Sequence, residues 1–143
     1  MRRLLATWLL SGLCLGAQAY DFVSVAEPAI LYDANSLKAK KLYVATRYLP
    51  LQQIVVLEAW VKARDSTGKV FWIEKHHLSS KRYVVVTAQV AKVYNSWTDR
   101  APVVFVASRQ LGLEWQGNTG SWVKVRHRDG STGYIRAADV WGE

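Results

Sequence analysis

The aromatic side chains in the second half of the chain are the residues whose types best suit molecular recognition. Tyr94, Trp97 and Trp115 fall in segments predicted as loops or strand ends. Tyr134 follows a glycine in a later predicted strand. Such rings combine a large apolar contact area with a polar N–H or O–H group, which suits a ligand such as a peptide or a sugar ring. The alternative is packing in a core or between domains; Trp97 stands in a polar segment, so we expect it to be an exposed contact.

Other residue types show no comparable pattern for catalysis or metal binding. The sequence contains no recognisable Ser–His–Asp triad, nucleophile elbow or glycine-rich phosphate loop. No spacing of carboxylates indicates a pair for glycoside hydrolysis. His76 and His77 are adjacent, with Glu74 nearby. Neighbours on a strand point to opposite sides, whereas a metal site needs both rings on one side. We therefore predict a non-enzymatic protein with no catalytic residues, no metal site and no cofactor.

Composition and charge narrow the classes of partner. The 143 residues include 19 Lys+Arg and 11 Asp+Glu, a net charge of +8, and half of them are hydrophobic, which excludes wholesale disorder. The positive charge is spread along the chain, and the lack of a single basic block argues against nucleic acid as the partner. Small basic clusters at 38–41 and 126–128 suit anionic wall polymers or phospholipid head groups, with an ordinary solvated surface as the alternative.

The first nineteen residues have the pattern of a cleaved secretory signal. Arginines at 2–3 precede an apolar run over 4–16, and the segment ends in Ala-Gln-Ala at 17–19. The apolar run is shorter than the ~20 residues that span a bilayer, so a retained anchor is the less favoured alternative. A lipid-modified Cys14 is also less favoured, because Leu13 before it is not small. We predict an exported protein, periplasmic or secreted, with no transmembrane segment after cleavage.

An internal repeat predicts two domains. A gapless alignment of residues 22–78 with residues 84–140, at an offset of 62, gives 16 identities in 57 positions, where unrelated sequences of this composition would give roughly 4. The identities include turn glycines as well as apolar residues. They pair Tyr32 with Tyr94, Trp60 with Trp122, Gly68 with Gly130 and Ile73 with Ile135. We predict domains at 20–80 and 81–143, after a signal peptide at 1–19, with Lys81-Arg82 in the linker.

Each unit is predicted to be all-β. Runs rich in Val, Ile and aromatic residues are short and separated by turn residues, and no segment shows a sustained 3.6-residue period. In the second unit these runs are Tyr83–Val90, Val103–Ser108, Leu111–Trp115, Trp122–Arg126 and Thr132–Ile135. Apolar and polar residues alternate in Trp122–Arg126, as expected of a strand with one buried face. Strands this short suggest a small β-barrel in each unit, because closure hides sheet edges. Units of about 60 residues are marginal alone, so the two are expected to pack on each other.

Two segments of the second unit carry a family resemblance. Trp122–Arg126 followed by Asp129–Ile135 resembles the second half of an SH3 domain. More specifically, it is similar to the bacterial SH3 (SH3b) family, whose pattern is G-x-W-x-x-V, a D-G or N-G turn, and G-W/Y-[VI]. The first unit repeats this pattern at Glu58–Arg64 and Thr67–Ile73, with Phe71 in place of the expected glycine. The resemblance implies two tandem small SH3-like β-barrels.

The resemblance also implies a function. SH3b domains are usually accessory binding modules of envelope or cell-wall proteins, so the implied partner is peptidoglycan, through its peptide, or another envelope protein. Polyproline binding is not implied, because Arg136 and Asp139 stand where eukaryotic SH3 domains have the Pro and Tyr that bind proline-rich helices. The alternatives are a small envelope hydrolase, its accessory or its inhibitor, and an SH3-like nucleic-acid module, which the predicted signal disfavours.

Overall fold

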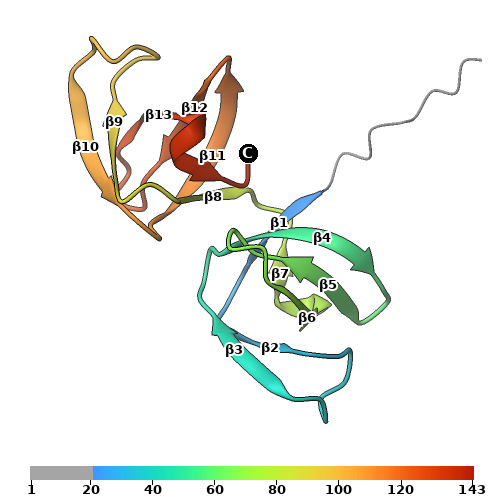
Figure 1. The fold of residues 1–143 in the computed structure, drawn as a ribbon. Coiled ribbons are helices and arrows are strands. Elements are labelled where there is room, and N and C mark those ends of the chain that lie inside the picture. The colour runs from blue at the N-terminus through green and yellow to red at the C-terminus, as the bar shows by residue number, and fades with distance from the viewer. Residues whose placement is uncertain (1–20) are drawn as a thin grey trace, which may run out of the picture.

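The chain forms two antiparallel β-sheets that follow one another along the sequence (Figure 1). The computed structural model describes residues 21–143, so the predicted signal peptide at 1–19 lies outside the described residues. Within residues 21–143 the helical segments are two three-residue 3₁₀ turns, and the prediction of an all-β protein is confirmed. No helix in this part of the chain is long and apolar enough to cross a membrane.

The two sheets have the same strand order. The first comprises β1 (Phe22–Val25), β2 (Ala29–Tyr32), β3 (Lys41–Ala45), β4 (Pro50–Val56), β5 (Trp60–Arg64), β6 (Val70–Glu74) and β7 (Leu78–Ser79), with the 3₁₀ turn η1 (Lys75–His77) before β7. The second comprises β8 (Tyr83–Val86), β9 (Val90–Tyr94), β10 (Val103–Ser108), β11 (Gly112–Thr119), β12 (Trp122–Arg126), β13 (Thr132–Arg136) and β14 (Val140–Trp141), with η2 (Ala137–Asp139) before β14. The orders are β3-β2-β6-β5-β4-β1-β7 and β10-β9-β13-β12-β11-β8-β14. Each element of the second sheet starts within one residue of the offset of 62 from its counterpart.

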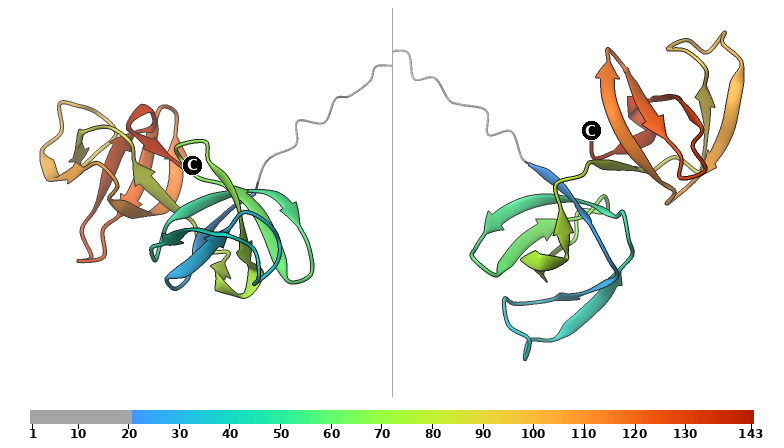
Figure 2. Two further views of the ribbon diagram at one scale, coloured as in Figure 1. Left: turned by 60° about the horizontal axis from the view of Figure 1, so that its bottom comes forward. Right: turned by 180° about the vertical axis from the view of Figure 1, so that it is seen from behind.

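The sheets are open, and the prediction of closed barrels is wrong. β3 and β7 each have one neighbour in the first sheet, as do β10 and β14 in the second. β7 and β14 contain two residues each, which leaves too few N–H and C=O groups for a further ladder. Each unit is therefore a sheet that curls around its own core without closing (Figure 2).

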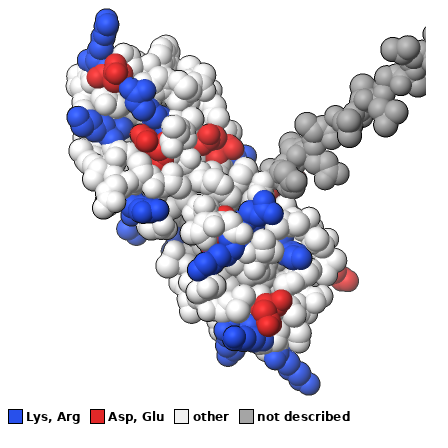
Figure 3. Space-filling model, in the orientation of Figure 1, with Lys and Arg blue, Asp and Glu red and all other residues white. Residues whose placement is uncertain are grey.

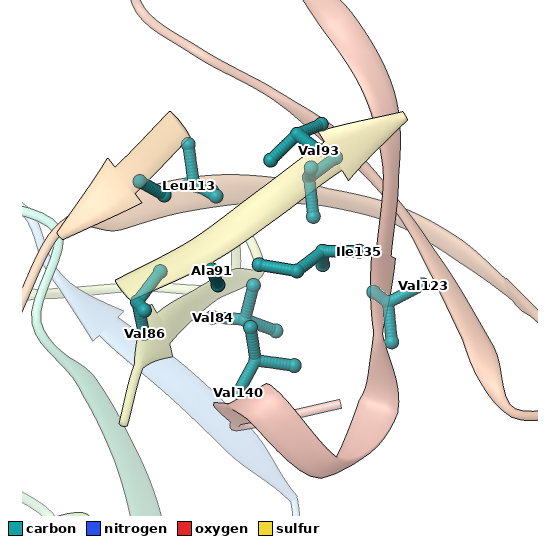
Figure 4. Packing of buried hydrophobic residues seen from close by; sticks show 10 residues of the cluster. Val84, Val86, Ala91, Val93, Leu113, Val123, Ile135 and Val140 are labelled. Atoms are coloured by element: carbon teal, nitrogen blue, oxygen red, sulfur yellow. The ribbon is translucent and has the colours of Figure 1, made fainter. Parts of the chain in front are cut away.

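Each unit has its own hydrophobic core. Figure 4 shows that of the second unit, formed by side chains that include Val84, Val86, Ala91, Val93, Leu113, Val123, Ile135 and Val140. In β12, Val123 and Val125 are fully buried while Lys124 and Arg126 are exposed. This alternation is expected of a strand with one buried face, and it was predicted from the sequence.

One matched position is filled differently in the two cores. Gly133 lies where β13 approaches β9 so closely that an added Cβ would stand 2.6 Å from Val93 Cγ1 and 2.7 Å from the Tyr94 carbonyl oxygen. Its counterpart Phe71 is buried in the first core. The glycine of the SH3b-like pattern is therefore a steric requirement in the second unit, whereas the first unit accommodates an aromatic ring there.

Residues 81–82, predicted as the linker, make packed contacts with both units. The Arg82 guanidinium lies 5.3 Å from the centre of the Phe22 ring and 4.6 Å from that of Trp115. Its Nη2 also donates a hydrogen bond of 2.8 Å to the Gly142 carbonyl oxygen. Arg82 thus connects the first strand of one unit to the C-terminal end of the other.

Charged side chains are distributed over both units. On the face shown in Figure 3, Lys and Arg occur over both units, with Asp and Glu between them. This view agrees with the even spread of charge along the sequence, and it shows no single basic block on that face.

Candidate functional site: an exposed aromatic surface on the second unit

Four aromatic side chains of the second unit lie in two edge-to-face pairs. The ring centroids of Trp97 and Tyr134 are 5.6 Å apart at 86°, and those of Tyr94 and Trp122 are 5.7 Å apart at 89°. Tyr94 and Tyr134 are paired across β9 and β13, and residues directly opposed in antiparallel strands point to the same face. The two pairs therefore form one surface, called here the aromatic surface.

Trp97 is the most exposed ring of the aromatic surface. It is 56% exposed and lies in the loop 95–102 between β9 and β10. The Asn95 N–H donates to the Pro102 carbonyl oxygen at 2.9 Å and closes this loop. With the edge-to-face contact to Tyr134, this bond holds the indole outward, and a side chain already ordered loses less conformational entropy on binding. Trp97 thus has the exposure expected from its polar surroundings.

A charged pair borders the aromatic surface. The Arg136 guanidinium lies 5.0 Å from the centre of the Trp122 ring, and its Nη2 is 3.1 Å from Asp99 Oδ2. Both charged side chains are about half exposed, so the ion pair contributes little to stability. The ion pair does, however, place hydrogen-bond donors and acceptors at the edge of the aromatic surface.

Trp115 does not join this surface. Its strand, β11, is separated from β13 by β12. Its pairing partner on β12, Val125, is buried, so the indole lies on the core side of the sheet. The ring contacts Arg82, and its Nε1 donates to Asn118 Oδ1 at 2.7 Å. Of the four predicted contacts, the structure therefore brings together Tyr94, Trp97 and Tyr134, while Trp115 lies at the junction between the units.

The sequence pattern did not single out Trp122 as part of a surface, although the repeat contains the signal. The matched residues of the first unit, Tyr32 and Trp60, form the same edge-to-face pair, 5.5 Å apart at 84°. Tyr32 is buried, and Asn35 stands where the second unit has Trp97. The first unit thus has the paired rings without the exposed tryptophan.

A second concave region, called here the junction cleft, lies where the two units meet around Tyr48 and Tyr83. Their rings stack 4.5 Å apart at 23°, and cavities of about 320 and 370 Å³ adjoin them. The cationic side chains lining these cavities are Arg47, Lys81, Arg126 and Arg128. Tyr48 has a φ of 72° and its counterpart Gln110 a φ of 73°, a conformation that residues other than glycine seldom adopt. The cleft combines parts of both units, which is why local sequence patterns did not predict it.

The electrostatics of the junction cleft favour an anionic group. The neighbouring Tyr83 hydroxyl, and after it the charge of Glu114, raise the pKa of Lys81 above its ordinary value. Lys81 Nζ lies 3.5 Å from Glu114 Oε2. Glu114 is the one carboxylate among the described residues lining the two cavities, against four cations. A concave region with this balance attracts anions.

The histidine pair does not lie on a strand. His76 and His77 belong to η1, and their ring centroids are 4.0 Å apart. The expectation that the two rings point to opposite sides is therefore wrong, because a 3₁₀ turn does not alternate its side chains as a strand does. Ligand atoms of Glu74, His76 and His77 all lie within 4.8 Å of one another.

Comparisons with known proteins bear mainly on the second unit. Residues 91–142, which include the whole aromatic surface, match the family model of the bacterial SH3 domain. A comparison with curated proteins gives no match.

Three solved structures resemble the chain at low similarity. NlpC2 from Trichomonas vaginalis has a TM-score of 0.39 and 12% identity over 88% of this chain and 49% of that one. NlpC1 from the same organism has a TM-score of 0.40 and 14% identity over 96% and 51%. An NlpC/P60 family protein from Bacillus cereus ATCC 10987 has a TM-score of 0.39 and 13% identity over 84% and 55%. The chain spans about half the length of these proteins.

Proposed function

We propose that this protein is a non-enzymatic binding protein of the cell envelope and that the aromatic surface binds its partner. The observation that carries the proposal is the exposed Trp97, held against Tyr134, within the segment 91–142 that matches the bacterial SH3 family model. We further propose that two SH3b units, at 20–80 and 81–143, follow a signal peptide at 1–19 that exports the chain to the periplasm or beyond.

The proposed partner is peptidoglycan, bound through its peptide, or another envelope protein. Support comes from the shape and chemistry of the surface. Trp97 and Tyr134 offer apolar faces that pack on the aliphatic parts of a peptide or on a sugar ring. Arg136 and Asp99, at the edge of the rings, offer a charged donor and a charged acceptor to the polar groups of the same ligand.

A proline-rich helix is a poor match for this surface. Recognition of such a helix requires flat apolar rings that are free to stack on proline. Here the Arg136 guanidinium lies over the Trp122 ring, and the ion pair with Asp99 holds it there. This arrangement supports a mode of binding other than that of eukaryotic SH3 domains.

The main alternatives are a small envelope hydrolase, its accessory or its inhibitor. They differ from the proposal in what happens to the cell wall. A hydrolase releases soluble muropeptides from purified sacculi, and an inhibitor slows their release by a second enzyme. A binding protein is retained on the sacculi and leaves the rate of release unchanged.

Retention of the tag-free protein on purified peptidoglycan sacculi tests the proposal, with proteomic identification of co-purifying envelope proteins. Trp97→Ala removes the exposed ring, and loss of a central aromatic anchor weakens binding by at least about tenfold. The matched control is Leu37→Ala, which removes a similarly exposed apolar side chain from the corresponding loop of the first unit. Retention of this control should equal that of the unaltered protein.

The melting temperature separates binding from folding. Because Trp97 is exposed, Trp97→Ala should melt within a few degrees of the unaltered protein. The proposed site is wrong if Trp97→Ala unfolds the protein, or if it leaves retention unchanged on both sacculi and a captured partner.

A further inference from the structure

His77 lies between two carboxylates. Its Nδ1 is 3.0 Å from Glu27 Oε1, and its Nε2 is 3.4 Å from Glu74 Oε2. A neutral imidazole has one N–H donor and one lone pair. When Nδ1 donates to Glu27, the lone pair of Nε2 faces the negative carboxylate of Glu74. A cation placed beside Nε2 of His77 and Oε2 of Glu74 would be attracted by both of these electron-rich atoms.

A third ligand stands beside this pair. The ring of His76 lies 4.0 Å from that of His77, and ligand atoms of both histidines and of Glu74 lie within 4.8 Å of one another. Ligands in a tetrahedral zinc site lie about 2.1 Å from the metal and hence about 3.4 Å from one another. His76 is exposed, so its side chain is free to rotate toward that spacing when an ion binds.

We propose that Glu74, His76 and His77 bind a Zn²⁺ ion, with water in the fourth position. Two imidazoles and a carboxylate form a ligand set suited to zinc. The carboxylate of Glu27 is a positioning group, because it accepts the Nδ1 proton of His77 and thereby directs the Nε2 lone pair toward the ion.

The backbone holds Glu27 in this place. The Ala26 N–H donates to the His77 carbonyl oxygen at 2.8 Å, which ties the segment between β1 and β2 to η1. The Arg47 Nε donates to the Ala26 carbonyl oxygen at 2.9 Å and anchors the same segment from a second side. These bonds hold the backbone that carries Glu27 close to η1.

The second unit shows that the ligand set is not a consequence of the backbone alone. There the Ala88 N–H donates to the Asp139 carbonyl oxygen at 3.3 Å, as Ala26 does to His77 in the first unit. The residues matched to Glu27, Glu74, His76 and His77 are Gln89, Arg136, Ala138 and Asp139. The same scaffold therefore carries no comparable pair of imidazoles in the second unit. Because all four residues of the proposed site lie in the first unit, the inference is independent of the function proposed for the aromatic surface.

Isothermal titration of the tag-free full chain with ZnCl₂ tests the site. One ion per chain should bind. His76→Ala and His77→Ala should each weaken the affinity roughly hundredfold or more, and Glu27→Ala about tenfold, because loss of an orienting carboxylate lowers metal affinity less than loss of a ligand. The matched control is His127→Ala, which removes the remaining histidine of the chain from the second unit and should leave zinc binding unchanged.

Two further measurements make the outcome unambiguous. X-ray absorption of the zinc-loaded protein should show two imidazole nitrogens with oxygen ligands, and circular dichroism should show that every variant is folded. Absence of zinc binding to the folded protein would overturn the proposal. Zinc binding that survives His76→Ala combined with His77→Ala would overturn it equally.

Discussion

The two units share a backbone plan but display different chemistry on it. Each has seven strands in the same order, a 3₁₀ turn before the last strand and an edge-to-face Tyr–Trp pair. The differences lie in the loops, in the 3₁₀ turns and at the ends of strands. The first unit surrounds η1 with Glu27, Glu74 and two histidines, whereas the second exposes Trp97 and places Arg136 over Trp122. The sheets therefore act as a common support, and the residues that distinguish the two surfaces lie in connecting segments and at the ends of strands.

The largest expected effects concern the matched core position where the units differ. Phe71→Ala should lower the free energy of unfolding by about 3–5 kcal/mol, because it leaves a cavity in the first core. Gly133→Ala should lower it by about 1–3 kcal/mol for the opposite reason, since its Cβ would overlap the Tyr94 carbonyl oxygen and Val93. Urea denaturation measures both.

The two substitutions act in opposite ways, because alanine is too small for this position in the first unit and too large for it in the second. If Gly133→Ala left the stability unchanged, β9 and β13 would have to separate easily to make room for the added Cβ. Thermal melts followed by tryptophan fluorescence provide the check that each variant still folds.

An intermediate effect is expected at the contact that joins the units. Arg82→Ala removes a hydrogen bond from a charged donor to the Gly142 carbonyl oxygen, and such bonds contribute about 1.5–3 kcal/mol. The Nε of Arg82 is buried with no hydrogen-bond partner among the described residues. We therefore expect Arg82→Ala to lower the free energy of unfolding by an amount at the lower end of that range. Lys81→Ala is the control, because its side chain is exposed. Equal unfolding curves for Arg82→Ala and the unaltered protein would show that the units do not depend on this contact.

The smallest expected effect is a pH dependence in the turn between β12 and β13. The Ser131 N–H donates to Asp129 Oδ1 at 2.8 Å and lowers the pKa of that carboxyl. A lowered pKa in the folded state means that stabilisation is complete above the ordinary pKa of Asp and is lost as the pH falls through the folded-state pKa. Asp129→Asn should therefore be less stable than the unaltered protein at neutral pH, and the difference should disappear in acid. A difference that persists at pH 2 in thermal melts would contradict this origin.

The sequence predicted the parts of the fold that depend on local pattern. Alternation in β12 indicated its buried face, and matched glycines at positions 68 and 130 indicated the turns, where both adopt positive φ. Closure of the sheets was predicted wrongly, because it depends on hydrogen bonds between distant strands and the final strands have two residues each. No periodic pattern distinguishes a two-residue strand from a loop.

The exposure of Trp97 could be predicted, because the residues next to it in the sequence are polar. Trp115 was misplaced because its direction depends on the register of β11, which contains an irregularity between Trp115 and Gly117. The histidine pair was misjudged because a three-residue 3₁₀ turn leaves no periodic signature in a sequence. The junction cleft is lined by residues of both units, so it could not be predicted from the pattern within either repeat.

The most direct test of the central claim maps binding onto the two units within one spectrum. Soluble muropeptides released from sacculi are titrated into the isotope-labelled protein, and the indole N–H resonances of the tryptophans are followed by NMR. Trp97 and Trp122 should shift in a saturable manner, while Trp60 and Trp72 of the first unit should stay in place. Saturable shifts confined to Trp60 and Trp72, or no shift at Trp97 while the protein is retained on sacculi, would contradict the assignment of recognition to the aromatic surface.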